Sequence, residues 1–252
     1  MINKEEDNKM VWLQLNKIHN WDCLELMKQI PDWSIDCIIT DPPYWTTACK
    51  WDIVIPFEPM REQLKRIIKP NGAIVLFGSE PFSSALRMSN IKNYKYDWIW
   101  EKEQWANFML MKYQPYKVHE IISVFSKNSH IYNPQMTEWK PYISGKWTSW
   151  DVSWNVIKIQ TKNEWNRYPR SIQKFTTDKS KSVHPTQKPV ALIEYLIRTH
   201  TNEWEIVLDF AMWSWTTAIA SINTGRNFIW IELLQEYVTI ANERVNAFVS
   251  SK

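Results

Sequence analysis

Short apolar runs alternate with helical segments along most of this chain, and this alternation constrains its fold most strongly. The compact apolar runs at 35–40 and 73–77 are bounded by turn residues and predict buried strands. Strands that alternate with helices form a mostly parallel α/β sheet, doubly wound by helices on both faces. After a short strand and a helix within 16–30, the predicted strands are residues 35–40, 73–77, 94–100, 120–125, 205–210 and 226–232, and the predicted helices are residues 57–69, 81–90, 189–200, 214–224 and 233–249.

The size and composition of the chain exclude several classes of protein. Its 252 residues suit one large domain or two small ones, and 44% hydrophobic and 23% charged residues exclude a disordered or collagen-like chain. No apolar run is long enough to span a bilayer, and the first ten residues lack the apolar core of a secretion signal. Three cysteines, Cys23, Cys37 and Cys49, have no metal-ligand spacing. We therefore expect a reduced, cytoplasmic protein with no membrane partner and no metal.

Glycine and tryptophan occur in abnormal proportions. The chain has 4 glycines and 17 tryptophans, whereas glycine usually makes up about 7% of a globular protein. Several tryptophans stand in turn contexts that ordinarily hold glycine, such as Trp21 after Asn20 and Trp33 after Asp32. A further pair, Trp213 and Trp215, lies between a predicted strand and a predicted helix, where a glycine loop is usual.

A misread codon would account for these proportions. Trp51, Trp98 and Trp100 lie among apolar neighbours and are interpreted as genuine, and Trp12 is undecided. Returning the other thirteen tryptophans to glycine restores the usual glycine content of about 7%. Our hypothesis is that UGA codons meaning glycine were translated as tryptophan; UGG codons at both 213 and 215 would refute it. The alternative is a tryptophan-rich protein with real aromatic clusters.

Two strand ends carry residues suited to chemistry. Asp209 lies at the end of the predicted strand 205–210, one residue before its last, and Glu232 ends the next predicted strand. This spacing suits a nucleoside whose ribose binds Glu232. The segment lacks the lysine of a P-loop and the full G-x-G-x-x-G pattern, so a plain loop and helix start is the alternative. In the first half, Asp41-Pro42-Pro43-Tyr44 follows a strand. A carboxylate and a fixed carbonyl make acceptors for an NH₂ group, and the tyrosine ring offers a stacking face.

Three motifs resemble those of the amino-methylating DNA methyltransferases that use S-adenosylmethionine. They are T-D-P-P-Y at 40–44, H-P-T-Q-K-P at 184–189 and L-D-F-A-M-W-S-W-T-T at 208–217. Their order is that of the family's beta class, and the resemblance covers roughly residues 15–248. It implies a Rossmann-like methyltransferase sheet of seven strands, one antiparallel, with a circularly permuted motif order. The chain departs from the family at Trp45, Trp213 and Trp215, where the family has glycine.

The resemblance also implies a role for each matching residue. Asp41 and the Pro42 carbonyl would accept hydrogen bonds from the target amino group, Pro43 would keep the turn rigid, and Tyr44 would stack on the flipped base. His184 is given no catalytic role. The residues implied to bind the cofactor are Asp22 at the adenine, Glu232 at the ribose, Thr186, Gln187 and Lys188 closing the methionine pocket, and Asp209, Phe210, Trp213, Ser214, Trp215, Thr216 and Thr217 holding the methionine part.

A basic segment lies where the family keeps target recognition. Residues 139–188 hold ten lysines and arginines against three acids, which suits the phosphates of double-stranded DNA. We expect a single catalytic domain over 1–252, in which 16–127 carries the catalytic motif, 128–183 is an inserted recognition region and 184–252 binds the cofactor. The predicted DNA-binding residues are Lys158, Lys162, Arg167, Arg170 and Lys174. The alternative is a solvated loop with scattered charges.

The aspartate of the first motif favours adenine N6 as the methyl acceptor. Family members with cytosine N4 activity usually carry serine there, and cytosine N4 is the close alternative. Cytosine C5 methylation needs a cysteine after a proline, which the chain lacks. RNA or protein glutamine methylation is a further alternative, against which the basic segment argues. If Trp213 and Trp215 are genuine, the alternative is a protein that is not an enzyme: a relic that binds DNA but transfers no methyl group. A homodimer stays open, and a restriction endonuclease would be a separate chain.

Overall fold

A computed structural model describes residues 13–44, 53–106, 110–138, 140–143, 147–150, 156–159, 162–163, 166–176, 187–212 and 215–250. The chain divides into two compact units, residues 1–133 with 171–252, and residues 134–170. The second unit is shorter at both ends than the predicted insertion 128–183. Within the described part, no helix is both long enough and apolar enough to cross a membrane.

The first unit contains a sheet whose strands all run the same way except one. The seven strands predicted from the sequence are present, and a short eighth strand, β12, is added at one edge. Because β5 pairs antiparallel with both of its neighbours, it is the single reversed strand of this sheet. The predicted α/β class with one antiparallel strand is confirmed. In spatial order the strands are β1 (Lys17–Asn20), β14 (Asn227–Glu232), β13 (Ile206–Asp209), β2 (Ile35–Thr40), β3 (Ile68–Gly78), β5 (Lys117–Phe125), β4 (Tyr94–Ala106) and β12 (Ile172–Lys174).

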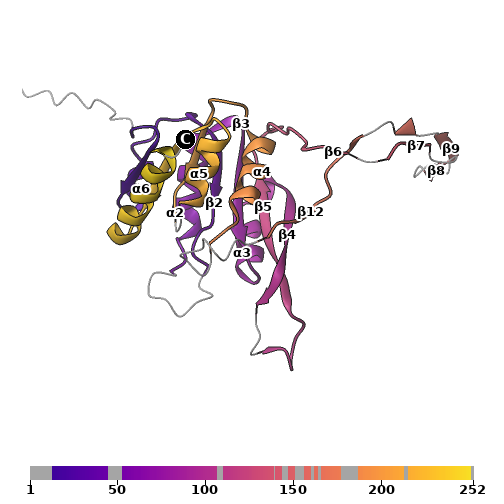
Figure 1. Ribbon diagram of the computed structural model, residues 1–252, viewed down its shortest axis with the longest axis horizontal. Helices are drawn as coiled ribbons and strands as arrows, with labels where there is room; N and C mark the ends of the chain where they lie inside the picture. The colour runs from indigo at the N-terminus through magenta and orange to yellow at the C-terminus, as the bar shows by residue number, and fades with distance from the viewer. Residues whose placement is uncertain are drawn as a thin grey trace, which may run out of the picture. The chain divides into compact units, whose positions relative to one another are not determined.

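Helices cover both faces of this sheet (Figure 1). Along β2, Ile38 packs into the core on one face, whereas Cys37 and Ile39 pack into the core on the other, as the two-residue period of a strand requires. Both faces are therefore buried, which explains the continuous apolar run of this strand. The first face meets α1 (Cys23–Met27), α2 (Phe57–Ile67) and α3 (Phe82–Ser89), and the second meets α4 (Val190–His200) and α5 (Thr216–Asn223), with α6 (Gln235–Ser250) beside α5 and β14.

The junction between α2 and β3 differs from the prediction. The helix ends at Ile67 rather than 69, and the chain enters β3 directly at Ile68. The register of β3 on β2 shifts after Ile68, so Pro70 and Gly72 lie in an irregularity of the strand, where a missing ladder hydrogen bond is tolerated. A Cβ atom on Gly72 would lie 2.7 Å from the Asp36 carbonyl oxygen, so this glycine permits a close backbone approach.

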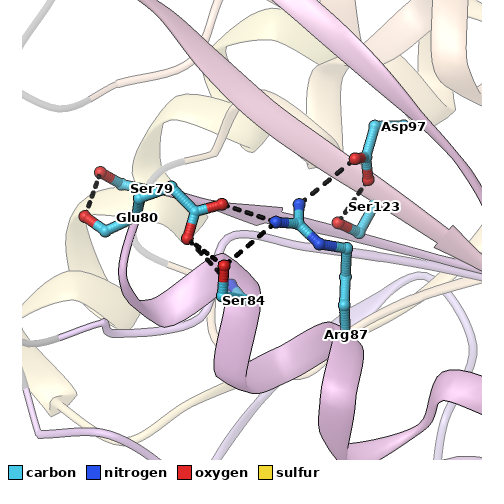
Figure 2. Close-up of polar contacts among 6 residues, drawn as sticks. All are labelled: Ser79, Glu80, Ser84, Arg87, Asp97 and Ser123. Atoms are coloured by element: carbon cyan, nitrogen blue, oxygen red, sulfur yellow. Dashed lines mark hydrogen bonds and ion pairs between the residues drawn. The ribbon is translucent and has the colours of Figure 1, made fainter.

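A hydrogen-bonded group of charged and polar side chains fastens α3 to the sheet (Figure 2). Arg87 of α3 donates to Glu80 Oε1 at 2.6 Å and to Asp97 Oδ2 of β4 at 3.2 Å. Ser84 donates its hydroxyl to Glu80 Oε2 at 2.7 Å, and Ser123 of β5 donates to Asp97 Oδ1 at 2.7 Å. The group fixes α3, and with it Phe82, against the end of β3.

The structure separates the tryptophans into different environments. Trp98 and Trp100, interpreted as genuine, are buried in the core, and the Trp100 indole nitrogen donates to the Phe175 carbonyl at 3.0 Å. Trp33 and Trp204, among the thirteen suspected glycines, have φ values of 53° and 67° and are 64% and 76% exposed. Left-handed φ values disfavour a bulky side chain and suit glycine.

Trp230 is a suspected glycine with a different environment. Its ring is fully buried on β14 and lies 3.5 Å from the ring of Phe228, with the two planes 5° apart. Its indole nitrogen has no hydrogen-bond partner among the described residues. The buried indole nitrogen of Trp98, a tryptophan interpreted as genuine, also has no partner among the described residues, so this feature does not separate the two classes. Trp12, Trp45, Trp51 and Cys49 lie outside the described residues.

The second unit is a two-stranded antiparallel ribbon (residues 134–170). Three antiparallel strand pairs are nested, and the pairing shifts by one residue from each pair to the next. The sequence predicted no regular structure here, because strands of two to four residues are too short to display a periodic pattern. The pairs are β6 (Thr137–Glu138) with β11 (Asn166–Arg167), β7 (Tyr142–Ile143) with β10 (Lys162–Asn163), and β8 (Trp147–Trp150) with β9 (Val156–Ile159).

Candidate active site

The acids of the sequence motifs lie along one edge of the sheet. This edge is where the parallel strands end: the register aligns the last residues Asn20 and Glu232, and it places Thr40, the last residue of β2, beside Leu76, two residues before the end of β3. Asp22, Glu232, Asp209 and Asp41 follow or end β1, β14, β13 and β2, which are successive neighbours. Ligands of open α/β sheets bind at this edge, so these four acids share one candidate site.

The Asp41 carboxylate is held by a buried lysine. Lys188 Nζ donates to Asp41 Oδ2 at 2.5 Å, and the hydroxyl of Tyr44 also bonds to this carboxylate. Burial raises the pKa of Asp41, Lys188 opposes that rise, and Glu120 adds to it. The adjacent Pro42 and Pro43 are buried, which fixes the backbone carbonyl beside the carboxylate. Asp41 is therefore a rigidly placed acceptor.

Tyr44 is half-buried against aromatic side chains of the α2 and α3 helices. Its ring centroid lies 5.5 Å from that of Phe82, which in turn lies 5.4 Å from that of Phe57. Burial raises the pKa of Tyr44 well above its ordinary value, and Asp41 adds to the rise, so the hydroxyl stays protonated. The position of this ring thus depends on α3 and on the group of side chains around Arg87.

Lys188, predicted to help close a pocket for methionine, makes contacts that the sequence did not indicate. Its ammonium lies between two carboxylates, 2.5 Å from Asp41 Oδ2 and 3.2 Å from Glu120 Oε2. Glu120 also forms an ion pair with Lys102. Sequence analysis missed Glu120 and Lys102. The available signal was a glutamate directly before the apolar run 121–125 of a buried strand.

Asp209 organises the loop between β13 and α5. Its Oδ2 accepts from Thr217 Oγ1 at 2.8 Å, and its Oδ1 accepts from the Ala211 amide at 3.3 Å. The Phe210 amide donates to Thr40 Oγ1 at 3.2 Å, which ties this loop to the strand that carries Asp41. Burial raises the pKa of Asp209 to about 7, although these hydrogen bonds oppose the rise. Asp209 is therefore only partly ionised at neutral pH.

Glu232 and Asp22 lie at the far end of the same edge. The Leu234 amide donates to Glu232 Oε1 at 2.8 Å, and burial raises the pKa of Glu232 to about 7. Asp22 Oδ1 caps α1 by accepting from the Leu24 amide at 2.9 Å. Two carboxylates at neighbouring strand ends suit a ligand that carries hydroxyl groups and positive charge, as a nucleoside joined to an amino acid through a sulfonium centre does. The donor and acceptor set therefore fits S-adenosylmethionine.

The rest of the predicted cofactor loop is only partly described. Thr216 is buried at the start of α5, and Gln187 is half-buried beside Lys188. Trp215 precedes α5 with a φ of −62°, which any residue adopts, and its ring centroid lies 3.5 Å from the Arg244 guanidinium carbon. Its backbone therefore does not require glycine. Thr186, Trp213, Ser214 and His184 lie outside the described residues.

The predicted DNA-binding residues fall in both units. Lys174 is exposed on β12 at the edge of the main sheet. Arg167 lies on β11 of the antiparallel ribbon, and Arg170 is exposed just after it. The backbones of Lys158 and Lys162 lie on β9 and β10, the returning half of the ribbon.

Comparisons with known proteins agree on one family. A family model described as DNA methylase matches residues 35–243. The type II methyltransferase M1.MboII of Moraxella bovis is 27% identical over 259 residues, which cover 93% of this chain and 98% of that protein. The type II methyltransferase M.HinfI of Haemophilus influenzae is 27% identical over 263 residues, which cover 92% of this chain and 68% of that protein.

Solved structures share the fold over nearly the whole chain. The crystal structure of the M1.HpyAVI–SAM complex matches with a TM-score of 0.62 and 26% identity, over 90% of this chain and 98% of that one. The cytosine-N4-specific PvuII DNA methyltransferase matches with a TM-score of 0.63 and 16% identity, over 90% of this chain and 85% of that one. At the latter identity the likeness concerns the fold alone.

Proposed function

This chain belongs to the N6/N4 DNA methylase family, and from that premise we propose that it methylates the N6 amino group of adenine in double-stranded DNA, using S-adenosylmethionine. One observation carries this proposal: Asp41, the acid of the T-D-P-P-Y motif, is a half-buried carboxylate held in place by Lys188. Aspartate in this position favours adenine N6 over cytosine N4, for which serine is usual. Both bases present an exocyclic NH₂ group, so the geometry of the acceptors serves either.

Asp41 and Pro42 would orient the amino group. Its two hydrogens would donate to the Asp41 carboxylate and the Pro42 carbonyl, which directs the nitrogen lone pair toward the methyl donor. Tyr44 would stack on the base and hold its plane. These contacts contribute by positioning and electrostatics, without a covalent intermediate on the protein.

Residues at the adjacent strand ends would hold the cofactor. Bound S-adenosylmethionine supplies a methyl group activated by a sulfonium centre. Glu232 would accept from the ribose hydroxyls, Asp22 would contact the adenine, and Asp209 would shape the loop around the methionine part through Thr217. The anionic strand ends suit the positive charge of this cofactor.

The antiparallel ribbon and Lys174 would contact DNA. A two-stranded ribbon fits the major groove, where the base pairs are distinguishable, and the ribbon holds six lysines and arginines against three acids. An adenine within a duplex cannot reach Asp41, so the base must be flipped out. Arg167 and Arg170, together with Lys158 and Lys162, would bind phosphates and position the ribbon.

The relatives support one biological setting. The curated relatives named above are type II methyltransferases, which supports a role in restriction–modification in the cytoplasm. The matching endonuclease would be a separate chain. A homodimer is the second assembly to test, by sedimentation of the protein with and without DNA.

Analysis of DNA methylated in cells would test the proposed function directly. DNA from cells that express the gene should contain N6-methyldeoxyadenosine at one short sequence motif, detected by nucleoside mass spectrometry and modified-base sequencing. Cells that express the Asp41→Ala variant are the matched control. N4-methyldeoxycytidine instead would establish the alternative base, and no modification from a protein that binds DNA would support the relic.

A further inference from the structure

Four side chains of alternating charge form a buried row beside the catalytic motif. They are Asp41 after β2, Lys188 before α4, Glu120 on β5 and Lys102 on β4. Lys188 Nζ lies 2.5 Å from Asp41 Oδ2 and 3.2 Å from Glu120 Oε2, and Lys102 is paired with the other oxygen of Glu120. The side chains of Asp41, Lys188 and Glu120 are 18%, 7% and 11% exposed. This row shields the ammonium of Lys188 from solvent.

The reversed direction of β5 brings Glu120 to this place. Glu120 pairs with Trp100 of β4, and the amino-terminal end of β5 lies at the edge where the parallel strands end. A glutamate buried at the start of an apolar strand is expensive to desolvate, and a buried ion pair contributes little net stability. Its position beside Lys188 therefore calls for a role in the site.

The shared lysine couples the two carboxylates. An ammonium has three protons and a single positive charge. Lys188 shares this charge between the carboxylates of Asp41 and Glu120. If Glu120 were absent, the whole charge would fall on Asp41 and occupy the carboxylate that must accept the substrate. If Lys188 were absent, burial and the nearby Glu120 would favour the protonated, neutral form of Asp41.

We infer that Glu120 is a positioning residue for methyl transfer: it holds Lys188 between the two carboxylates, so that the ammonium is shared and the Asp41 carboxylate can still accept the target amino group, while Lys188 keeps Asp41 ionised. This inference rests on the proposed role of Asp41. Glu120 does not contact the base or the cofactor in this scheme, and it acts through Lys188. Lys102 balances the charge that Glu120 adds to the site.

The electrostatics of the neighbouring groups agree with this division. Burial alone would raise the pKa of Glu120, but Lys188 and Lys102 outweigh it and hold that pKa below its ordinary value. Burial alone would lower the pKa of Lys188, but Asp41, Glu120 and Tyr44 raise it well above its ordinary value.

Among the described residues, the ionisable groups that face Asp41 are Lys188, Glu120 and Tyr44, and Asp209 interacts with it from β13. Lys117, on β5 with Glu120, is held by Ser79.

Opposite shifts of the pH profile would distinguish this role from a structural one. In Glu120→Gln, we expect kcat to fall about tenfold, since one charge-assisted hydrogen bond to the substrate is weakened, with the cofactor Kd unchanged. The acid limb of the kcat profile should move to lower pH, because a negative charge near Asp41 is removed. In Lys188→Met, the acid limb should move to higher pH. The readout is single-turnover methylation of a duplex between pH 5 and 9.

Three further variants make each outcome decisive. Glu101→Gln removes an exposed carboxylate from the neighbouring position on β4 and should leave the profile unchanged. Glu120→Asp retains the charge and should recover most of kcat. Its acid limb should move to lower pH, but by less than in Glu120→Gln. If Glu120→Gln does not fold, the shift in Glu120→Asp is measured in its place. If the acid limb of the kcat profile does not move in the Glu120 variant, or moves to higher pH as in Lys188→Met, the inference is overturned. Full activity of Asp41→Asn would instead overturn the proposed role of Asp41.

Discussion

Trp33 and Trp204 occupy backbone conformations that a tryptophan disfavours. At φ values of 53° and 67°, the Cβ atom of any L-residue crowds its own backbone, at a cost of about 1–2 kcal/mol. Both rings are largely exposed and gain little from packing. These two positions give the strongest physical support to the hypothesis that glycine codons were read as tryptophan.

Glycine at these two positions should stabilise the protein. We expect Trp33→Gly and Trp204→Gly each to raise the free energy of unfolding by about 1 kcal/mol, because relief of the strain exceeds the entropy cost of glycine. Urea unfolding with a constant m-value is the measurement. Trp21→Gly, which replaces an exposed tryptophan with no positive φ, is the matched control and should not stabilise. Equal effects at all three positions would contradict this account.

The cofactor loop provides a second test at the residue scale. If Trp213 and Trp215 stand where glycine is native, replacing both by glycine should strengthen S-adenosylmethionine binding at least about tenfold, or about 1.4 kcal/mol. Calorimetry on proteins of verified mass measures this difference. Tight binding by the protein with both indoles present would show that the loop accommodates them, and the codon hypothesis would lose its functional support.

The α3 helix depends on one arginine for its attachment to the sheet. We expect Arg87→Met to lower the free energy of unfolding by about 1–3 kcal/mol, because Glu80 and Asp97 lose a shared partner that is largely shielded from water. It should also weaken DNA methylation, since Phe82 positions Tyr44. Lys28→Met breaks an exposed pair with Glu25 on α1 and should change stability by less than about 1 kcal/mol. Equal losses in the two variants would contradict the role of this group.

The antiparallel ribbon should supply part of the affinity for DNA. Replacing Arg167 and Arg170 by alanine should weaken binding to a duplex and reduce the slope of log K against log salt concentration by about two, one for each phosphate contact. Fluorescence anisotropy over a salt series measures both. Lys65→Ala, an exposed lysine on α2, is the control. An unchanged slope in the double variant would show that these arginines do not bind phosphates.

The strands and helices of the main sheet could be predicted from sequence because each has a clear period. The apolar run of β2 and the amphipathic pattern of α2 extend over enough residues to be recognised, and the motif at Asp41 marks a strand end. The ribbon could not be predicted, because its strands of two to four residues carry no period. The end of α2 was misplaced by two residues, because the irregular start of β3 follows the helix without a loop.

At the scale of the whole molecule, the site draws on residues that are far apart in the chain. Asp41, Asp209 and Glu232 could be identified from motifs, and their meeting follows from the parallel strands that carry them. Glu120 could not be identified, because its position at the same edge depends on the reversal of β5. The contact of Lys188 with Asp41, 147 residues away, depends likewise on tertiary structure rather than on any local signal.

Cofactor binding should be linked to proton release. Burial raises the pKa of Asp209 and of Glu232 to about 7, so each is partly protonated at neutral pH. A bound sulfonium and ammonium favour the ionised carboxylates, which lowers their pKa and releases protons. Affinity should therefore rise between pH 6 and pH 8. Calorimetry in buffers of different ionisation enthalpy counts the protons, and Glu232→Gln should reduce the count. Affinity that is independent of pH would contradict the linkage.

The pairing of β1 with β14 sets the moment at which a newly made chain acquires its activity. Residues 17–20 bond to residues 229–232, so β1 leaves the ribosome long before its partner exists. At bacterial synthesis rates the wait is on the order of 10–40 s. Until then the strand beside Asp22 has no neighbour, and the edge that holds Glu232 and Asp209 has not been made. A nascent chain, or one released before residue 232, would therefore carry its catalytic motif without the means to modify DNA.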